Sequence, residues 1–199
     1  MMQLLYLSLL FATQFCSIAR GSFGPCKHHN VQENFTMSQY LGTWYEIERS
    51  GSTDSDTRCI KEKYSINEEH KIELLTQYVE KGNSLNIHKG DVFYSSTEKN
   101  PAKFFFRITN EYERWGSFGM SPLDHILMPY WVLATDYTTY SLVLSCASAL
   151  ITHHDYIWIL GRERQLSKNV TDYLHEILKT SNINVNLVPI DQHNCTVVY

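Results

Sequence analysis

The chain of 199 residues is long enough for one domain preceded by a leader. Hydrophobic residues make up 43% of it and charged residues 19%, which predicts a packed core and excludes wholesale disorder. The formal net charge of -4 argues against a nucleic-acid partner, because such proteins normally carry a basic patch.

The first 21 residues have the character of a secretory signal peptide. An apolar stretch from Leu4 to Ile18 is followed by small residues, so we expect cleavage near residues 19–21 and a single domain over residues 22–199. The stretch is short for a membrane span, and no later segment approaches 18 apolar residues in a row. We therefore expect a secreted, extracellular protein.

Cysteine usage agrees with secretion. Four cysteines follow the leader, namely Cys26, Cys59, Cys146 and Cys195. In a secreted chain this number predicts two disulfides, with three possible pairings. No two of them have the close spacing of zinc ligands, so we expect no metal site. The chain also contains three N-glycosylation sequons, at Asn34, Asn169 and Asn194.

Residues 22–40 have little periodicity and are expected to be irregular. After them come extended segments rich in Tyr, Phe, Ile, Val and Trp, with turn residues between them. These segments are Thr43–Arg49, Cys59–Ile66, Lys71–Glu80, Leu85–Tyr94, Lys103–Thr109, Tyr130–Thr135, Tyr140–Ala147 and Asp155–Arg162. Short strands with hairpin-length gaps predict an all-β antiparallel sandwich or barrel.

One helix is expected after these strands, with Ser167 as its N-cap. Its apolar residues share one face and are Val170, Leu174, Ile177 and Leu178. A short extended stretch over Asn182–Ile190 follows.

The last long strand carries apolar residues on both faces. Tyr156, Trp158 and Leu160 alternate with Ile157 and Ile159. A barrel with the helix packed outside explains both faces, because the first three side chains then point inward and the other two meet the helix. An eight-stranded barrel has room inside for one small ligand.

Three short motifs occur in order along the chain. Gly42-Thr43-Trp44 begins the first strand, Thr135-Asp136-Tyr137 lies at a turn between strands, and Arg162 ends the eighth strand. Together they resemble the three motifs of the lipocalin family.

Longer segments extend this resemblance from about Cys26 to Cys195. They are similar to the apolipoprotein D-like branch of the lipocalins, which includes bilin-binding pigments of insects, and they read VQENFTMSQYLGTWYEIER, PYWVLATDY and WILGRE.

The resemblance implies an eight-stranded antiparallel up-and-down barrel with one C-terminal helix packed outside. It also implies the disulfides Cys26–Cys146 and Cys59–Cys195. Trp44 should close one end of the barrel, with Arg162 over its indole face in a cation–π contact of about 0.5–2 kcal/mol. Thr135 and Asp136 should bind backbone amides in their turn.

Carried over by position, the ligand contacts are Tyr64, Thr76, Tyr130 and Trp158. Alternation along the strands supports them and adds Phe104, Phe106 and Tyr156 as inward-pointing residues. Lys61 and Lys63, for example, demand solvent and so place Tyr64 inward.

These features predict a carrier of one small hydrophobic molecule, such as a bilin, a fatty acid or a steroid- or retinoid-like compound, with no cofactor. The alternative is an extracellular protein that binds a receptor or a lipid surface through apolar loop residues. Those residues lie in or beside the long gap over residues 110–129, and they are Met120, Leu123, Ile126, Leu127 and Met128.

An enzyme is not expected. A cysteine nucleophile needs a free thiol, and all four mature cysteines are expected in disulfides. The pairs His28-His29 and His153-His154 do not chelate one ion well, because neighbours on a strand face opposite ways; a lone inward His154 as a haem ligand is a minor alternative. Ser145, His154 and Asp155 lack a nucleophile-elbow motif.

Overall fold

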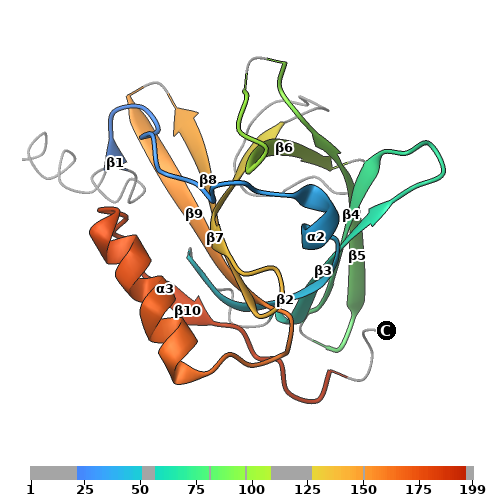
Figure 1. The fold of residues 1–199 in the computed structure, drawn as a ribbon. Helices are drawn as coiled ribbons and strands as arrows, with labels where there is room; N and C mark the ends of the chain where they lie inside the picture. Colours follow the sequence, from blue (N-terminus) through green and yellow to red (C-terminus); the bar gives the residue numbers. More distant parts are fainter. Residues whose placement is uncertain are drawn as a thin grey trace, which may run out of the picture.

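The computed structural model describes residues 22–50, 57–80, 82–96, 98–108, 127–149 and 151–195. The expected leader, residues 1–21, and residues 110–126 of the long gap lie outside these ranges. The described chain is mostly β, and its strands form a closed antiparallel ring (Figure 1).

Each strand of the ring pairs with the next along the chain, and the last pairs back with the first. The ring consists of β2 (Gly42–Ser50), β3 (Arg58–Ile66), β4 (Ile72–Val79), β5 (Leu85–Phe93), β6 (Lys103–Ile108), β7 (Met128–Thr135), β8 (Tyr140–Ala149) and β9 (Thr152–Gly161). This is the predicted up-and-down barrel, and closure leaves no edge within the ring.

Two short strands lie at the margins of the ring. β1 (Ser22–Phe23) pairs with β9, and β10 (Leu187–Pro189) pairs with β2. The segment expected to be irregular therefore contains β1, and it also contains a single helical turn, α2 (Met37–Tyr40). One turn is too short to leave a helical period in the sequence, so alternation could not predict it.

The predicted helix is α3 (Lys168–Thr180), and the side chain of Ser167 accepts a hydrogen bond from the backbone N–H of Val170. The helix lies outside the barrel (Figure 1). Leu174 and Leu178 are buried in one cluster with Ile157 and Ile159 of β9, as alternation predicted. Within the part of the chain that the structure describes, neither helix has the length and apolarity to cross a bilayer.

Trp44 closes one end of the barrel. Its side chain is completely buried, and its indole N–H donates to the carbonyl oxygen of Tyr40 in α2 at 2.9 Å. The guanidinium carbon of Arg162 lies 3.7 Å from the centroid of the indole ring, within the range of a cation–π contact.

The same guanidinium group also holds two separate segments together at this end, namely residues 41–43 and the turn at Tyr137. It donates to the carbonyl oxygens of Tyr137, Thr43 and Leu41, at 2.8, 2.9 and 3.0 Å. Gly42 has a φ of +100°, and a Cβ there would lie 3.2 Å from a guanidinium nitrogen of Arg162. A side chain at Gly42 would therefore be strained and would crowd the arginine.

The turn between β7 and β8 lies at the same end and is held by its own side chains. Asp136 Oδ1 accepts from the backbone N–H groups of Thr138, Thr139 and Tyr140, at 3.1, 2.7 and 3.0 Å. Thr135 Oγ1 accepts from the N–H of Tyr137 at 3.0 Å. These backbone bonds hold the pKa of the Asp136 carboxyl below its ordinary value, against the opposing effect of burial.

Two disulfides attach the ends of the chain to the barrel, and they have the pairing that the resemblance implies. Cys26 is bonded to Cys146 in β8, and Cys59 in β3 is bonded to Cys195. Each closes a loop of more than 100 residues, for which the chain-entropy model gives about 4–5 kcal/mol of stabilisation.

Trp44→Ala should lower the free energy of unfolding by roughly 3–5 kcal/mol, because a fully buried aromatic ring is lost. Trp131→Ala is the matched control: this indole lies outside the inner cluster, only partly buried, with Lys103 over its ring. Urea unfolding of both variants measures the difference. An equal loss in the two variants would contradict the closing role of Trp44.

Candidate functional site

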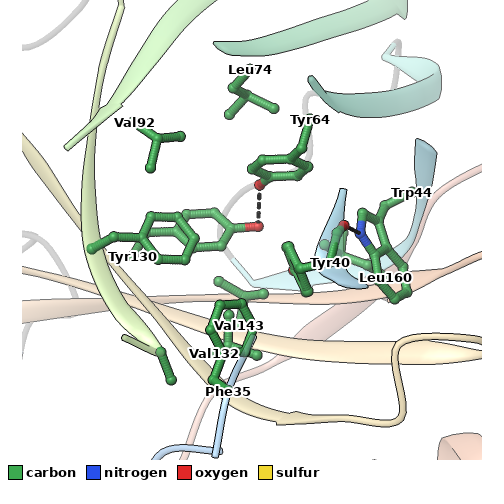
Figure 2. Packing of buried hydrophobic residues seen from close by; sticks show 12 residues of the cluster. Phe35, Tyr40, Trp44, Tyr64, Leu74, Val92, Tyr130, Val132, Val143 and Leu160 are labelled. Carbon is green, nitrogen blue, oxygen red and sulfur yellow. Dashed lines mark hydrogen bonds between the residues drawn. The ribbon is translucent and has the colours of Figure 1, made fainter. Parts of the chain in front are cut away.

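The barrel interior is sealed at the Trp44 end by a layer of buried side chains. One inward-facing residue from almost every strand contributes to this layer, and its members include Trp44, Tyr64, Leu74, Val92, Phe104, Val132, Val143 and Leu160. Phe35 and Tyr40, from the segment before β2, pack in the same cluster (Figure 2).

The next layers away from Trp44 are less completely buried. Each of these layers lies two residues along a strand from the sealed layer, the spacing that keeps side chains on the same face. Thr76 is related in this way to Leu74, Phe106 to Phe104 and Trp158 to Leu160. All three are only partly buried, whereas Leu74, Phe104 and Leu160 in the sealed layer are almost completely buried. The interior is therefore fully packed at the Trp44 end and less completely buried toward the opposite, open end.

A series of stacked rings runs through these layers. The rings of Phe104 and Tyr130 are 4.8 Å apart, those of Tyr130 and Trp158 are 6.3 Å apart, and those of Trp158 and Tyr156 are also 6.3 Å apart. All three pairs are stacked, with interplanar angles of 22°, 15° and 22°. Together the rings form a continuous flat wall from the sealed layer toward the open end.

The structure therefore brings the predicted ligand contacts to one lining. Tyr64, Phe104 and Tyr130 belong to the inner buried cluster, and Phe106 and Trp158 pack against it. Thr76 pairs with inward-facing Glu62 on β3 and with His88 on β5, and Tyr156 stacks on Trp158. That these side chains contact a ligand stays a prediction.

Sequence reasoning missed Glu62, a carboxyl group inside the barrel. Glu62 is only 7% exposed. Its Oε2 lies 2.9 Å from the hydroxyl oxygen of Tyr64 and 3.3 Å from that of Tyr130, and either hydroxyl can donate a hydrogen bond to it. The two hydroxyl oxygens are 2.7 Å apart (Figure 2). Burial raises the pKa of Glu62, and the hydrogen bonds from the two phenols oppose that shift.

Glu46 is a second carboxyl group on the inner side of the ring. It is 2% exposed and lies opposite Leu160, two residues after Trp44. Its Oε1 is 3.6 Å from Arg49 Nε, too far for a hydrogen bond, and has no hydrogen-bond partner among the described residues. Burial raises the pKa of Glu46 to about 8; Arg49 opposes the shift, and the nearby charge of Glu62 adds to it.

The signal for both glutamates was present in the alternation. Glu62 stands between Lys61 and Lys63 and is in phase with Tyr64, and Glu46 is in phase with Trp44. Residue type suggested exposure, because carboxylates are rarely fully buried. The position of each glutamate on its strand, and not its residue type, determines that it is buried.

The set Ser145, His154 and Asp155 is not assembled for catalysis. Alternation places Asp155 on the opposite face of β9 from His154, and its Oδ2 lies 3.8 Å from His153 Nε2 instead. Within the described ranges, no three His, Cys, Asp or Glu side chains gather in the way a metal ion requires.

The other predicted sites lie on the surface or outside the described ranges. The sequon asparagines Asn34, Asn169 and Asn194 are all exposed, and their glycosylation stays a prediction. Of the apolar loop residues, Met120, Leu123 and Ile126 are not described, Leu127 is exposed, and Met128 belongs to β7. The described positions of Leu127 and Met128 therefore give no support to binding of a receptor or a lipid surface through apolar loop residues.

Comparison with known proteins gives the same class as the fold. The sequence profile of the lipocalin / cytosolic fatty-acid binding protein family matches residues 41–194. Apolipoprotein D of Cavia porcellus is 37% identical over 98% of this chain and 97% of its own length. The Lazarillo protein of Schistocerca americana is 25% identical over 90% of this chain and 78% of its own length.

Among solved structures, insecticyanin of Manduca sexta has the same fold, with a TM-score of 0.70, 21% identity and coverage of 90% of this chain and 93% of its own. The chain belongs to the lipocalin family. Its similarity to apolipoprotein D extends over nearly the whole length, and members of the family are known for binding small hydrophobic ligands.

The raised pKa of Glu46 predicts that the protein loses stability as the pH rises from about 5 to about 8. Between the ordinary value of 4.5 and about 8, the folded chain binds a proton at Glu46 that the unfolded chain has released, so each rise in pH favours unfolding. In Glu46→Gln this contribution is gone, and the loss should be smaller.

Urea midpoints of the two proteins at both pH values measure the effect. His29, whose pKa is lowered chiefly by burial, gives the opposite slope, but it does so in both proteins and cancels in their difference. Identical pH dependence in the two proteins would show that Glu46 is not protonated in the folded barrel.

Proposed function

We propose that the protein is a secreted carrier that holds one small, mostly apolar molecule in the barrel interior and catalyses no reaction. The observation that supports this most directly is the stacked series Phe104, Tyr130, Trp158 and Tyr156, which leads from the sealed layer toward the open end. Aromatic walls offer large apolar area, and Tyr and Trp add oriented hydrogen bonds.

Flat conjugated molecules suit such a wall, since aromatic rings stack favourably at centroid separations of ~4.5–7 Å. Bilins and steroid- or retinoid-like compounds are candidates on this ground, and fatty acids are candidates through the resemblance to the family.

Secretion rests on the expected leader and on the two disulfides, which persist in oxidising compartments. Homologues of this family are typically secreted. Expression in a secretory host should give a mature N-terminus between residues 19 and 22, read by N-terminal sequencing of protein from the medium. Intracellular retention with Met1 in place would contradict the proposal.

Carriage predicts that a small apolar molecule copurifies with the native protein, to be identified by solvent extraction and mass spectrometry. Added bilins, retinoids, steroids or fatty acids should quench the tryptophan fluorescence of the emptied protein. Trp158→Ala should weaken the affinity at least about tenfold, or about 1.4 kcal/mol, because its ring forms part of the interior wall.

Trp131→Ala removes an indole that lies outside the inner cluster and should leave the affinity unchanged. The carrier proposal fails if nothing copurifies and no compound of the panel changes the fluorescence.

A further inference from the structure

Glu62 is a buried carboxylate for which no cation is provided. Among the described residues, no lysine, arginine or histidine forms an ion pair with it, and its hydrogen bonds come only from the hydroxyls of Tyr64 and Tyr130 at Oε2. The second oxygen, Oε1, has no partner there. Glu62 faces the interior between Trp44 on β2 and Thr76 on β4, at the boundary between the sealed layer and the accessible layers.

Glu46 on the neighbouring strand presents a buried acceptor that receives no hydrogen bond from the described residues. Its Oε1 is fully buried without a hydrogen bond, and its one cation, Arg49, lies 3.6 Å away. The two carboxyl groups are close enough to influence each other electrostatically. A buried polar atom without a partner costs free energy, and a buried charge without one costs more. Neither glutamate is explained by packing, since an apolar residue would fill either position without that cost.

We propose that Glu46 and Glu62 select the cargo by its polar end: they favour an apolar molecule that carries a protonated amine and disfavour one that ends in a carboxylate. This deepens the proposed carrier function and rests on it. An ammonium group has three donors and no acceptor, which matches carboxylate oxygens that lack donors. Phenol hydroxyls already occupy Oε2 of Glu62, so the amine would bind at Oε1 of each glutamate.

The neighbouring rings fit the same cargo. Tyr130 donates toward Glu62 and also stacks between Phe104 and Trp158, so a molecule held at Glu62 lies with its apolar part along the aromatic wall. Tyr and Trp faces themselves attract cations. A carboxylate at this depth would meet the buried carboxyl group of Glu62, which has no cation to compensate it among the described residues, in a medium of low dielectric, and this leaves it only the open end.

Three probes with the same apolar chain test this selection, namely decylamine, decanol and decanoate. Each is titrated into the emptied full-length protein at neutral pH and physiological salt, with tryptophan fluorescence as the readout. We expect decylamine to bind at least about tenfold more tightly than decanoate, with decanol between them, a difference of about 1.4 kcal/mol or more.

Glu62→Gln keeps the shape of the side chain and an oxygen for the two phenols, and it should reduce the preference for decylamine over decanol by at least about fivefold. Glu48→Gln is the matched control. It removes the same charge from the other face of β2, where Glu48 pairs with His175 of α3 at 2.7 Å, and it should leave the preference unchanged. Thermal unfolding of each variant verifies the fold.

The outcomes separate this inference from the carrier function. Decanoate binding as tightly as decylamine, or an equal effect of Glu48→Gln and Glu62→Gln, overturns the selection by the glutamates and leaves carriage intact. If none of the three probes binds and the wider panel also fails, the carrier function itself is wrong. If Glu62→Gln does not fold, the order of the three probes on the unsubstituted protein still decides the question.

Discussion

The contact between Arg162 and Trp44 is the interaction on which the rest of the molecule depends. One guanidinium group covers the indole face and binds carbonyl oxygens from the α2 segment, from β2 and from the turn after β7. Segments far apart in the chain are thereby held across one opening of the ring. A barrel is open at both ends by construction, and only such a closure turns it into a cup that can keep an apolar molecule out of water.

The sheet has buried clusters on both of its faces, and these clusters stabilise the fold separately from the layers proposed to bind a ligand. The outer face of β8 and β9 packs under α3, so Leu142, Ile157 and Ile159 contribute a core that does not involve the interior. The sealed layer adds a second core at the Trp44 end. Because these two clusters carry the stability, the layers above can retain partly exposed rings and costly carboxyl groups. Residues that weaken the fold without packing well are most readily explained by binding.

Alternation predicted the strands and the inner faces because the period of side chains along a strand is fixed. It placed Trp158 inward and Ile159 outward from the sequence alone. The turn of α2 escaped prediction because its position depends on long-range contacts, such as the hydrogen bond between the hydroxyl groups of Tyr40 and Ser141 at 2.9 Å, and not on a local period. The inward position of Glu62 was not predicted because a glutamate is usually exposed. The alternation already indicated it, since Lys61 and Lys63 on either side occupy the solvent-facing side of the strand.

The positions of the two disulfides determine how the molecule would respond to a pulling force. The bonds Cys26–Cys146 and Cys59–Cys195 join the chain at two covalent junctions, and three lengths of backbone run in parallel between them. The shortest, from Cys26 to Cys59, would tighten first and bear the load. The longest, from Cys59 to Cys146, contains β3 to β8 and would remain slack. Tension on the two ends of the chain would therefore bypass most of the strands that surround the barrel interior.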